Sequence, residues 1–116
     1  MNVVDLQHRL LSDLRELNLP VSEVDLYLRP YSKSFYGRYF PACKGKRPKI
    51  YVYPFEHTGD FMSYQTILET TIHEFCHHVQ YASGHERVRG VMHDPQFWQL
   101  YNHYTNRARR LSLISA

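Results

Sequence analysis

The first eighteen residues alternate apolar and polar positions with the period of a helix. The apolar residues recur at steps of three and four: Val3, Leu6, Leu10, Leu14 and Leu17. This spacing places their side chains on one face of a helix over residues 3–18. Asn18 and Pro20 follow, and both residue types end helices. We therefore expect an amphipathic helix that buries one face.

Residues 21–55 show a period of two instead. Three runs of alternating or aromatic residues occupy positions 24–28, 35–40 and 49–53, and a proline follows each of them. Alternation of this kind is typical of strands, and proline is confined to strand ends and edges. Gly37 interrupts the second run. We expect three short strands in a small, mostly antiparallel sheet.

Helical periodicity returns in the second half of the chain. An apolar stripe runs through residues 63–82, before Gly84: Leu68, Ile72, Phe75, Val79 and Ala82. Asp94 followed by Pro95 predicts the start of another helix, because aspartate caps a first turn and proline fits its first position. The apolar face of this helix, over residues 95–113, comprises Phe97, Tyr101, Tyr104, Ala108 and Leu111. The expected fold class is α+β, in the order helix, three strands, helix, helix.

Composition narrows the class of protein. The 116 residues suit one domain over 1–116, and 43% hydrophobic with 15% aromatic residues exclude an intrinsically disordered chain. No apolar run approaches the roughly 20 residues of a membrane span, and the first residues are too polar for a signal peptide. Cys43 and Cys76 form no C-x-x-C pair. We expect a cytoplasmic monomer with free thiols and no membrane partner.

Candidate chemistry is concentrated in residues 73–77, which read His-Glu-Phe-Cys-His. His73 and His77 are four residues apart, so one helical face presents both imidazoles to a single metal ion. Glu74 lies about 100° further around the helix, where it reaches a water on the metal without being a ligand. The metal lowers the pKa of such a water towards about 7, and the glutamate takes its proton. The alternative is a polar pair at the edge of the apolar stripe.

A catalytic zinc ion usually has three protein ligands, so a third is needed beside the two motif histidines. The candidates are His78, His85, Glu86, His93 and His103. Helical spacing turns His78 away from the motif face, towards solvent or a supporting role. His103 lies among polar residues and is expected at the surface. We expect His93 to be the third ligand, because it directly precedes the cap of a helix that packs beside the metal helix; His85 is the alternative.

The two motifs together resemble those of the SprT-like (Spartan-type) zinc metallopeptidases. His73-Glu-Phe-Cys-His77 is followed, after fifteen residues, by His93-Asp-Pro-Gln-Phe-Trp98. The family pattern is H-E-x-x-H, a short loop and His-Gly-x-x-Phe, and YgjP-like and WLM-like peptidases are similar. Asp94 stands where SprT-like chains prefer glycine, and no cysteine-rich zinc ribbon follows. The resemblance covers residues 24–105 and implies that His73, His77 and His93 bind zinc and that Glu74 is the general base.

The strand predicted over residues 49–53 precedes the metal helix. In peptidases of this kind such a strand edges the cleft and pairs with an extended substrate through main-chain hydrogen bonds. The residues expected along the substrate are Lys49, Ile50, Tyr51, Val52 and Tyr53. An ordinary sheet strand is the alternative. The transition state also needs an oxyanion donor besides the metal, and six residues stay open for that role: Tyr36, Tyr39, His85, Arg87, Tyr101 and Tyr104.

Our interpretation is a zinc-dependent metalloendopeptidase that hydrolyses extended polypeptides, with DNA-associated proteins as a substrate class that the resemblance implies. Basic residues cluster at 44–49 and 107–110, and the net charge is +3. A solvated surface explains both clusters, and contact with DNA phosphates is the functional alternative. Two other functions stay open. One is a non-catalytic, metal-stabilised binding module with weak DNA affinity, and the other is a latent peptidase whose tail, 110–116, blocks its cleft.

Overall fold

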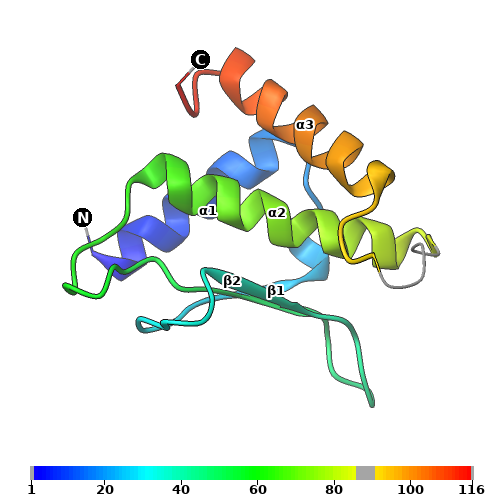
Figure 1. Ribbon diagram of the computed structural model, residues 1–116, viewed down its shortest axis with the longest axis horizontal. Helices are drawn as coiled ribbons and strands as arrows, with labels where there is room; N and C mark the ends of the chain where they lie inside the picture. Colours follow the sequence, from blue (N-terminus) through cyan, green and yellow to red (C-terminus); the bar gives the residue numbers. More distant parts are fainter. Residues whose placement is uncertain (1, 86–90, 116) are drawn as a thin grey trace.

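The computed structural model describes residues 2–85 and 91–115. Along the chain the elements are α1 (Val3–Glu16), a 3-10 turn η1 (Val21–Glu23), β1 (Asp25–Leu28), β2 (Gly37–Phe40), β3 (Lys49–Val52), α2 (Tyr64–Ala82) and α3 (Pro95–Arg110). The predicted α+β class and the order of elements are confirmed (Figure 1). No helix in the described part of the chain is long and apolar enough to cross a membrane.

The helices begin at side-chain caps. The caps are Asn2, Ser63 and Asp94, and each accepts a hydrogen bond from a backbone N–H of the first turn. A residue with positive φ lies two positions after the last residue of each helix: Asn18, Gly84 and Ser112. In all three cases the following residue donates its N–H to a carbonyl five residues back, the Schellman arrangement. This turn at Ser112 ends α3 at Arg110, so the helix predicted to reach residue 113 stops earlier and Leu111 is 41% exposed.

The sheet has the strand order β1-β3-β2, with β3 in the centre. Strand β1 pairs with β3 in parallel, and Leu26 lies beside Ile50. Strand β2 pairs with β3 antiparallel, and Tyr39 lies on the other side of Ile50. The sheet is therefore mixed, where mostly antiparallel pairing was expected. The chain reverses twice between β1 and β3, and β3 inserts between the two earlier strands.

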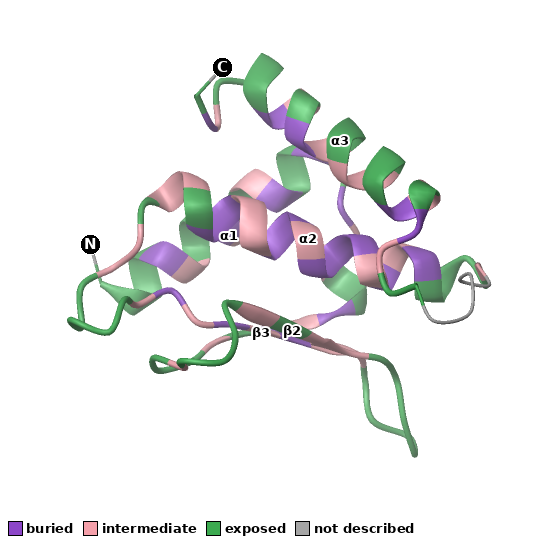
Figure 2. Cartoon of the chain, in the orientation of Figure 1, coloured by how far each residue is buried: buried purple, intermediate pink, exposed green. Residues whose placement is uncertain are grey.

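Helix α2 is the centre of the fold. It covers one face of the sheet, and α3 lies on its far side (Figure 1). Its residues Leu68, Ile72, Phe75 and Cys76 are fully buried, and the inward side chains of the sheet, such as Ile50, pack in the same core. Figure 2 shows this band of buried residues along α2. Because α2 is enclosed on two sides, polar residues in its middle face either a cavity or a specific partner.

Candidate metal centre

Three histidines converge between α2 and the start of α3. His73 and His77 lie on α2, and His93 directly precedes Asp94, the cap of α3. One ring nitrogen of each lies within 4.8 Å of the others, and the Nε2 atoms of His77 and His93 are 3.3 Å apart. Two nitrogen ligands of a tetrahedral zinc ion are about 3.3 Å apart. The three predicted ligand residues are therefore close enough to hold a metal ion.

The Phe97 ring packs against all three imidazoles. It is fully buried, and its ring centroid lies 4.6 to 4.8 Å from those of His73, His77 and His93. Burial, with a smaller effect of His93, lowers the pKa of His73 to about 4. The His73 ring is therefore neutral near pH 7, which is the form that binds a metal ion.

Glu74 lies beside the cluster under strand β2, and only 7% of it is exposed. Gly37 makes this approach possible, because a Cβ there would lie 3.0 Å from both Glu74 Cγ and Thr70 Cγ2. Burial raises the pKa of Glu74 to about 7, and the nearby Arg38 guanidinium opposes that rise. A carboxyl group with a pKa near neutral both takes and returns a proton readily.

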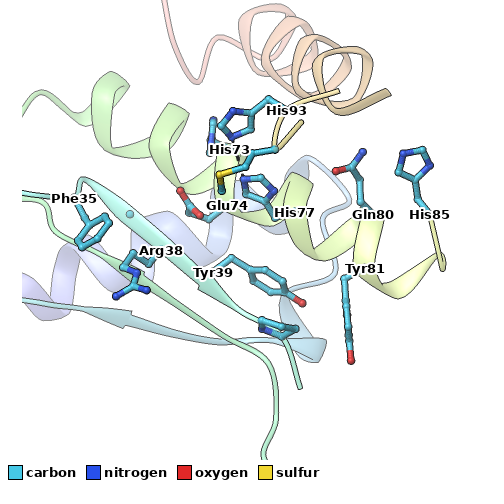
Figure 3. A pocket seen from close by; sticks show the side chains of 13 residues that line it. Phe35, Arg38, Tyr39, His73, Glu74, His77, Gln80, Tyr81, His85 and His93 are labelled. Carbon is cyan, nitrogen blue, oxygen red and sulfur yellow. Dashed lines mark hydrogen bonds between the residues drawn. The ribbon is translucent and has the colours of Figure 1, made fainter. Parts of the chain in front are cut away.

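Two cavities meet at the cluster. The larger, of about 680 Å³, extends along the C-terminal half of α2 past Gln80 and Tyr81 (Figure 3). The smaller, of about 400 Å³, extends towards Thr66 in the first turn of α2. Both include His73 and Glu74 in their walls. A linear ligand that occupied both would pass directly over these two side chains.

The strand that borders the cavities is β2. The interpretation of residues 49–53 as the cleft edge is wrong, because β3 is paired on both sides and has no free edge. Tyr36 directly precedes β2, and its carbonyl accepts the N–H of Tyr53, which directly follows β3. In an antiparallel pair every second residue bonds to the partner strand, so Arg38 and Phe40 face β3 in the same way. The main-chain groups of Gly37 and Tyr39 therefore point to the outer edge. Period-two alternation marks a strand and its faces, but it carries no information about which strand lies at the edge.

His78 is a buried link between three elements. It is turned away from the metal cluster as predicted, but it is only 3% exposed, so a solvent position is wrong. Its Nε2 is 2.8 Å from Glu23 Oε1, and its Nδ1 is 2.8 Å from the Tyr39 hydroxyl. Because a carboxylate only accepts, Nε2–H donates to Glu23, and in the neutral form of the ring Nδ1 then accepts from the Tyr39 hydroxyl. The His78 ring therefore holds the Tyr39 side chain of β2 in a fixed position.

His85 holds the cap of α3. Its Nε2 is 2.7 Å from Asp94 Oδ2, while Asp94 Oδ1 accepts from Phe97 N and Gln80 Nε2, both at 3.0 Å. These hydrogen bonds, that of His85 first, lower the pKa of Asp94 to about 2. His85 is therefore a partner of the cap next to His93, outside the metal cluster.

The remaining predicted candidates are dispersed. His103 is exposed, as expected, and Glu86 and Arg87 lie outside the described residues. Of the oxyanion candidates, Tyr39 and His85 line the larger cavity, and Tyr36 and Tyr101 line the smaller one. Tyr104 is in neither wall.

The tail does not enter the cleft. Ile114 is buried in the core, and Ser115 N donates to Gln65 Oε1 at the first turn of α2. None of the described tail residues 110–115 lines either cavity. This position gives no support to a latent peptidase blocked by its own tail.

Two residues of the site were missed by the sequence reasoning. Gly37 had a signal, since a glycine inside a strand often marks a close backbone approach. Gln80 had a weaker one, because it follows His77 by three residues and so shares its helical face. Comparison with known proteins assigns neither, because no protein-family model, curated protein or solved structure matches the chain. The resemblance to SprT-like peptidases rests on the two motifs alone.

Proposed function

We propose that the protein is a zinc-dependent metalloendopeptidase, of the SprT-like kind, that hydrolyses extended polypeptides. The observation that carries the proposal is the position of Glu74. This buried carboxyl group lies next to three converging imidazoles, below the free edge of a strand and at the junction of two cavities. A purely structural metal site has no use for a buried carboxyl group that is not a ligand.

The donor set suits zinc. His73, His77 and His93 would supply three neutral nitrogen ligands, and the cavity leaves the fourth side open, as in catalytic zinc sites. When bound, zinc polarises a peptide carbonyl and acidifies the attacking water. Glu74 is placed to take the proton from that water and to return it to the leaving amine.

Strand β2 positions the substrate. The outward main-chain groups of Gly37 and Tyr39 can pair with an extended polypeptide, as in other cases of strand addition. A chain held in this way runs along α2 and presents one carbonyl above Glu74. Because a cavity continues on both sides of His73 and Glu74, the substrate extends in both directions from the cleaved bond. This favours an endopeptidase over an enzyme that removes terminal residues.

The test replaces Glu74 in the zinc-loaded protein. Glu74→Gln should keep its zinc and lose peptide or casein hydrolysis by about 10²- to 10⁴-fold, the usual contribution of a general base. Glu16→Gln, at an exposed position on α1, is the matched control and should hydrolyse like the wild type. Wild-type protein that binds no zinc, or hydrolysis that survives Glu74→Gln, refutes the proposal.

A second candidate function is a metal-stabilised module that binds single-stranded nucleic acid, and the uncovered face of the sheet favours it. The rings of Tyr27 and Phe40 lie 5.8 and 5.1 Å from that of Tyr51. Lys49 Nζ is 5.1 Å from the rings of both Phe40 and Tyr51, and Arg38 Cζ is 4.8 Å from Phe40. Aromatic rings interleaved with cations are typical of surfaces that stack bases and contact phosphates.

This candidate is tested by the fluorescence anisotropy of labelled oligothymidylate. Binding should weaken as salt rises from about 50 to 200 mM, and the double change Phe40→Ala and Tyr51→Ala should reduce affinity by roughly tenfold or more. Tyr31→Ala, at an exposed aromatic residue before β2, is the control and should have no effect. Equal binding by the double variant contradicts the module.

A further inference from the structure

Gln80 has an unusual environment for a glutamine. It lies on α2, three residues after His77, and it is 3% exposed in the wall of the larger cavity. Its Nε2 donates to Asp94 Oδ1 at 3.0 Å and to Gln96 Oε1 at 2.6 Å. Its Oε1 is buried and has no hydrogen-bond partner among the described residues. Buried polar atoms are nearly always paired, so this oxygen calls for an explanation.

The orientation of the Gln80 amide is determined by its neighbour. The Asp94 carboxylate only accepts hydrogen bonds, and it also accepts from Phe97 N and lies 2.7 Å from His85 Nε2. An inverted amide would place its oxygen against this carboxylate, so the nitrogen must face Asp94. Figure 3 shows the Gln80 oxygen on the side of the three histidines and the nitrogen turned away from them.

We propose that Gln80 Oε1 binds an N–H donor of the polypeptide next to the cleaved bond. The inference rests on the proposed function, because it assumes a peptide chain in the cavity. The donor is an amide, guanidinium or ammonium group of a side chain that lies towards the C-terminal end of α2. A main-chain N–H of the same peptide carries the same chemistry and is the second source. A site built around a buried acceptor rejects ligands that leave this acceptor unpaired.

Binding is measured with the zinc-loaded Glu74→Gln variant, which should not cleave its ligand. The probes are fluorescein-labelled alanine-based peptides with glutamine, arginine or norleucine scanned through the central positions. At one position the glutamine and arginine peptides should bind about tenfold more tightly than the norleucine peptide. Adding Gln80→Met should bring this ratio to about one. Gln96→Met is the matched control, since it removes the other partner of the amide and should leave the ratio unchanged.

N-methylated peptides identify the source of the donor. In one outcome, Gln80→Met weakens the binding of all probes equally. If N-methylation of one residue then makes the affinities with and without Gln80→Met the same, the main-chain N–H of that residue is the donor. The inference is overturned if the glutamine and arginine peptides still bind more tightly than the norleucine peptide to the Gln80→Met protein. It is also overturned if Gln80→Met weakens the binding of all peptides equally and N-methylation does not change this loss. The second result would assign Gln80 only a structural role through Asp94. If wild-type protein cleaves no peptide, the proposed function fails, but the ratio measured in Glu74→Gln still tests the acceptor.

Discussion

Five of the eight histidines form two groups that differ in what surrounds their ring nitrogens. His73, His77 and His93 bring one ring nitrogen each within 4.8 Å of the others, at the wall of a cavity. His78 and His85 lie instead 2.8 and 2.7 Å from a carboxylate oxygen of Glu23 and Asp94. Converging nitrogens suit a metal ion. A histidine ring hydrogen-bonded to a carboxylate instead holds together the two segments of the chain that carry the ring and the carboxylate.

The contrast is sharpest between His77 and His78, which are neighbours in the sequence. Successive residues of a helix differ by about 100° in direction, so one ring faces the cavity and the other faces β2 and η1. The two groups are also physically connected. His85 is bonded to Asp94, the residue after His93, and His78 is bonded to Tyr39 on the strand beside the site. The second group thus supports the elements that carry the first.

The largest difference is expected in zinc affinity. His77→Ala should lower it by more than about 100-fold, because changes to residues that only support a ligand already cost about 10- to 100-fold. His78→Ala should bind zinc like the wild type. The measurements are zinc content after dialysis and competition with a chromophoric chelator. A folded His78→Ala protein without zinc would remove the distinction between the groups.

Removal of zinc should have the next largest effect. A ligand present at about 1,000 times its Kd stabilises the folded state by about 4 kcal/mol, which corresponds to roughly 10–20 °C in Tm for a domain of this size. We therefore expect EDTA to lower the Tm of the wild type by this amount, measured by circular dichroism. EDTA should not change the Tm of His77→Ala. An equal shift in both proteins would show that the chelator acts elsewhere.

His78→Phe should reduce the free energy of unfolding by about 1–3 kcal/mol, because it leaves the partly buried Tyr39 hydroxyl without its partner. The loss should be the same with and without zinc, as measured by urea denaturation. This independence of zinc is what separates the second group from the first. A loss confined to the zinc-loaded protein would place His78 with the metal ligands.

The smallest effect is expected for His85→Ala. Asp94 keeps its hydrogen bonds to Phe97 N and Gln80 Nε2, so the cap of α3 should remain. We expect a loss of less than about 1 kcal/mol in stability, as for other partly exposed polar pairs, and a change of no more than about tenfold in zinc affinity. Stability is measured by urea denaturation, and zinc affinity by competition with a chromophoric chelator. A loss of zinc affinity as large as that of His77→Ala would identify His85 as a ligand.

Local patterns were sufficient to predict the helices, the strands and the clustered histidines. The i, i+4 spacing of His73 and His77 dictates a shared face on any helix. The Asp-Pro signal at residue 94 correctly predicts where α3 begins, and so brings His93 to the site. These features depend on residues near one another in the chain.

Features that depend on distant residues could not be predicted in this way. The central position of β3 results from its simultaneous pairing with β1 and β2, which periodicity does not specify. The burial of His78 depends on Glu23, a residue 55 positions earlier in the chain. The expected substrate strand is consequently the central one of the sheet, and for His78, expected at solvent or in a supporting role, neither its burial nor its partner Glu23 was predicted.

The carboxylate of Asp94 has a consequence for the dynamics of the site. It holds the start of α3 through Phe97 N, Gln80 and His85, and none of these contacts involves a metal ion. The conformational entropy lost in placing the neighbouring His93 is therefore incurred when the chain folds rather than when an ion binds. A site that is already ordered binds its ion without first closing a loop. A metal ion at the proposed site would then enter and leave while α3 remains in place.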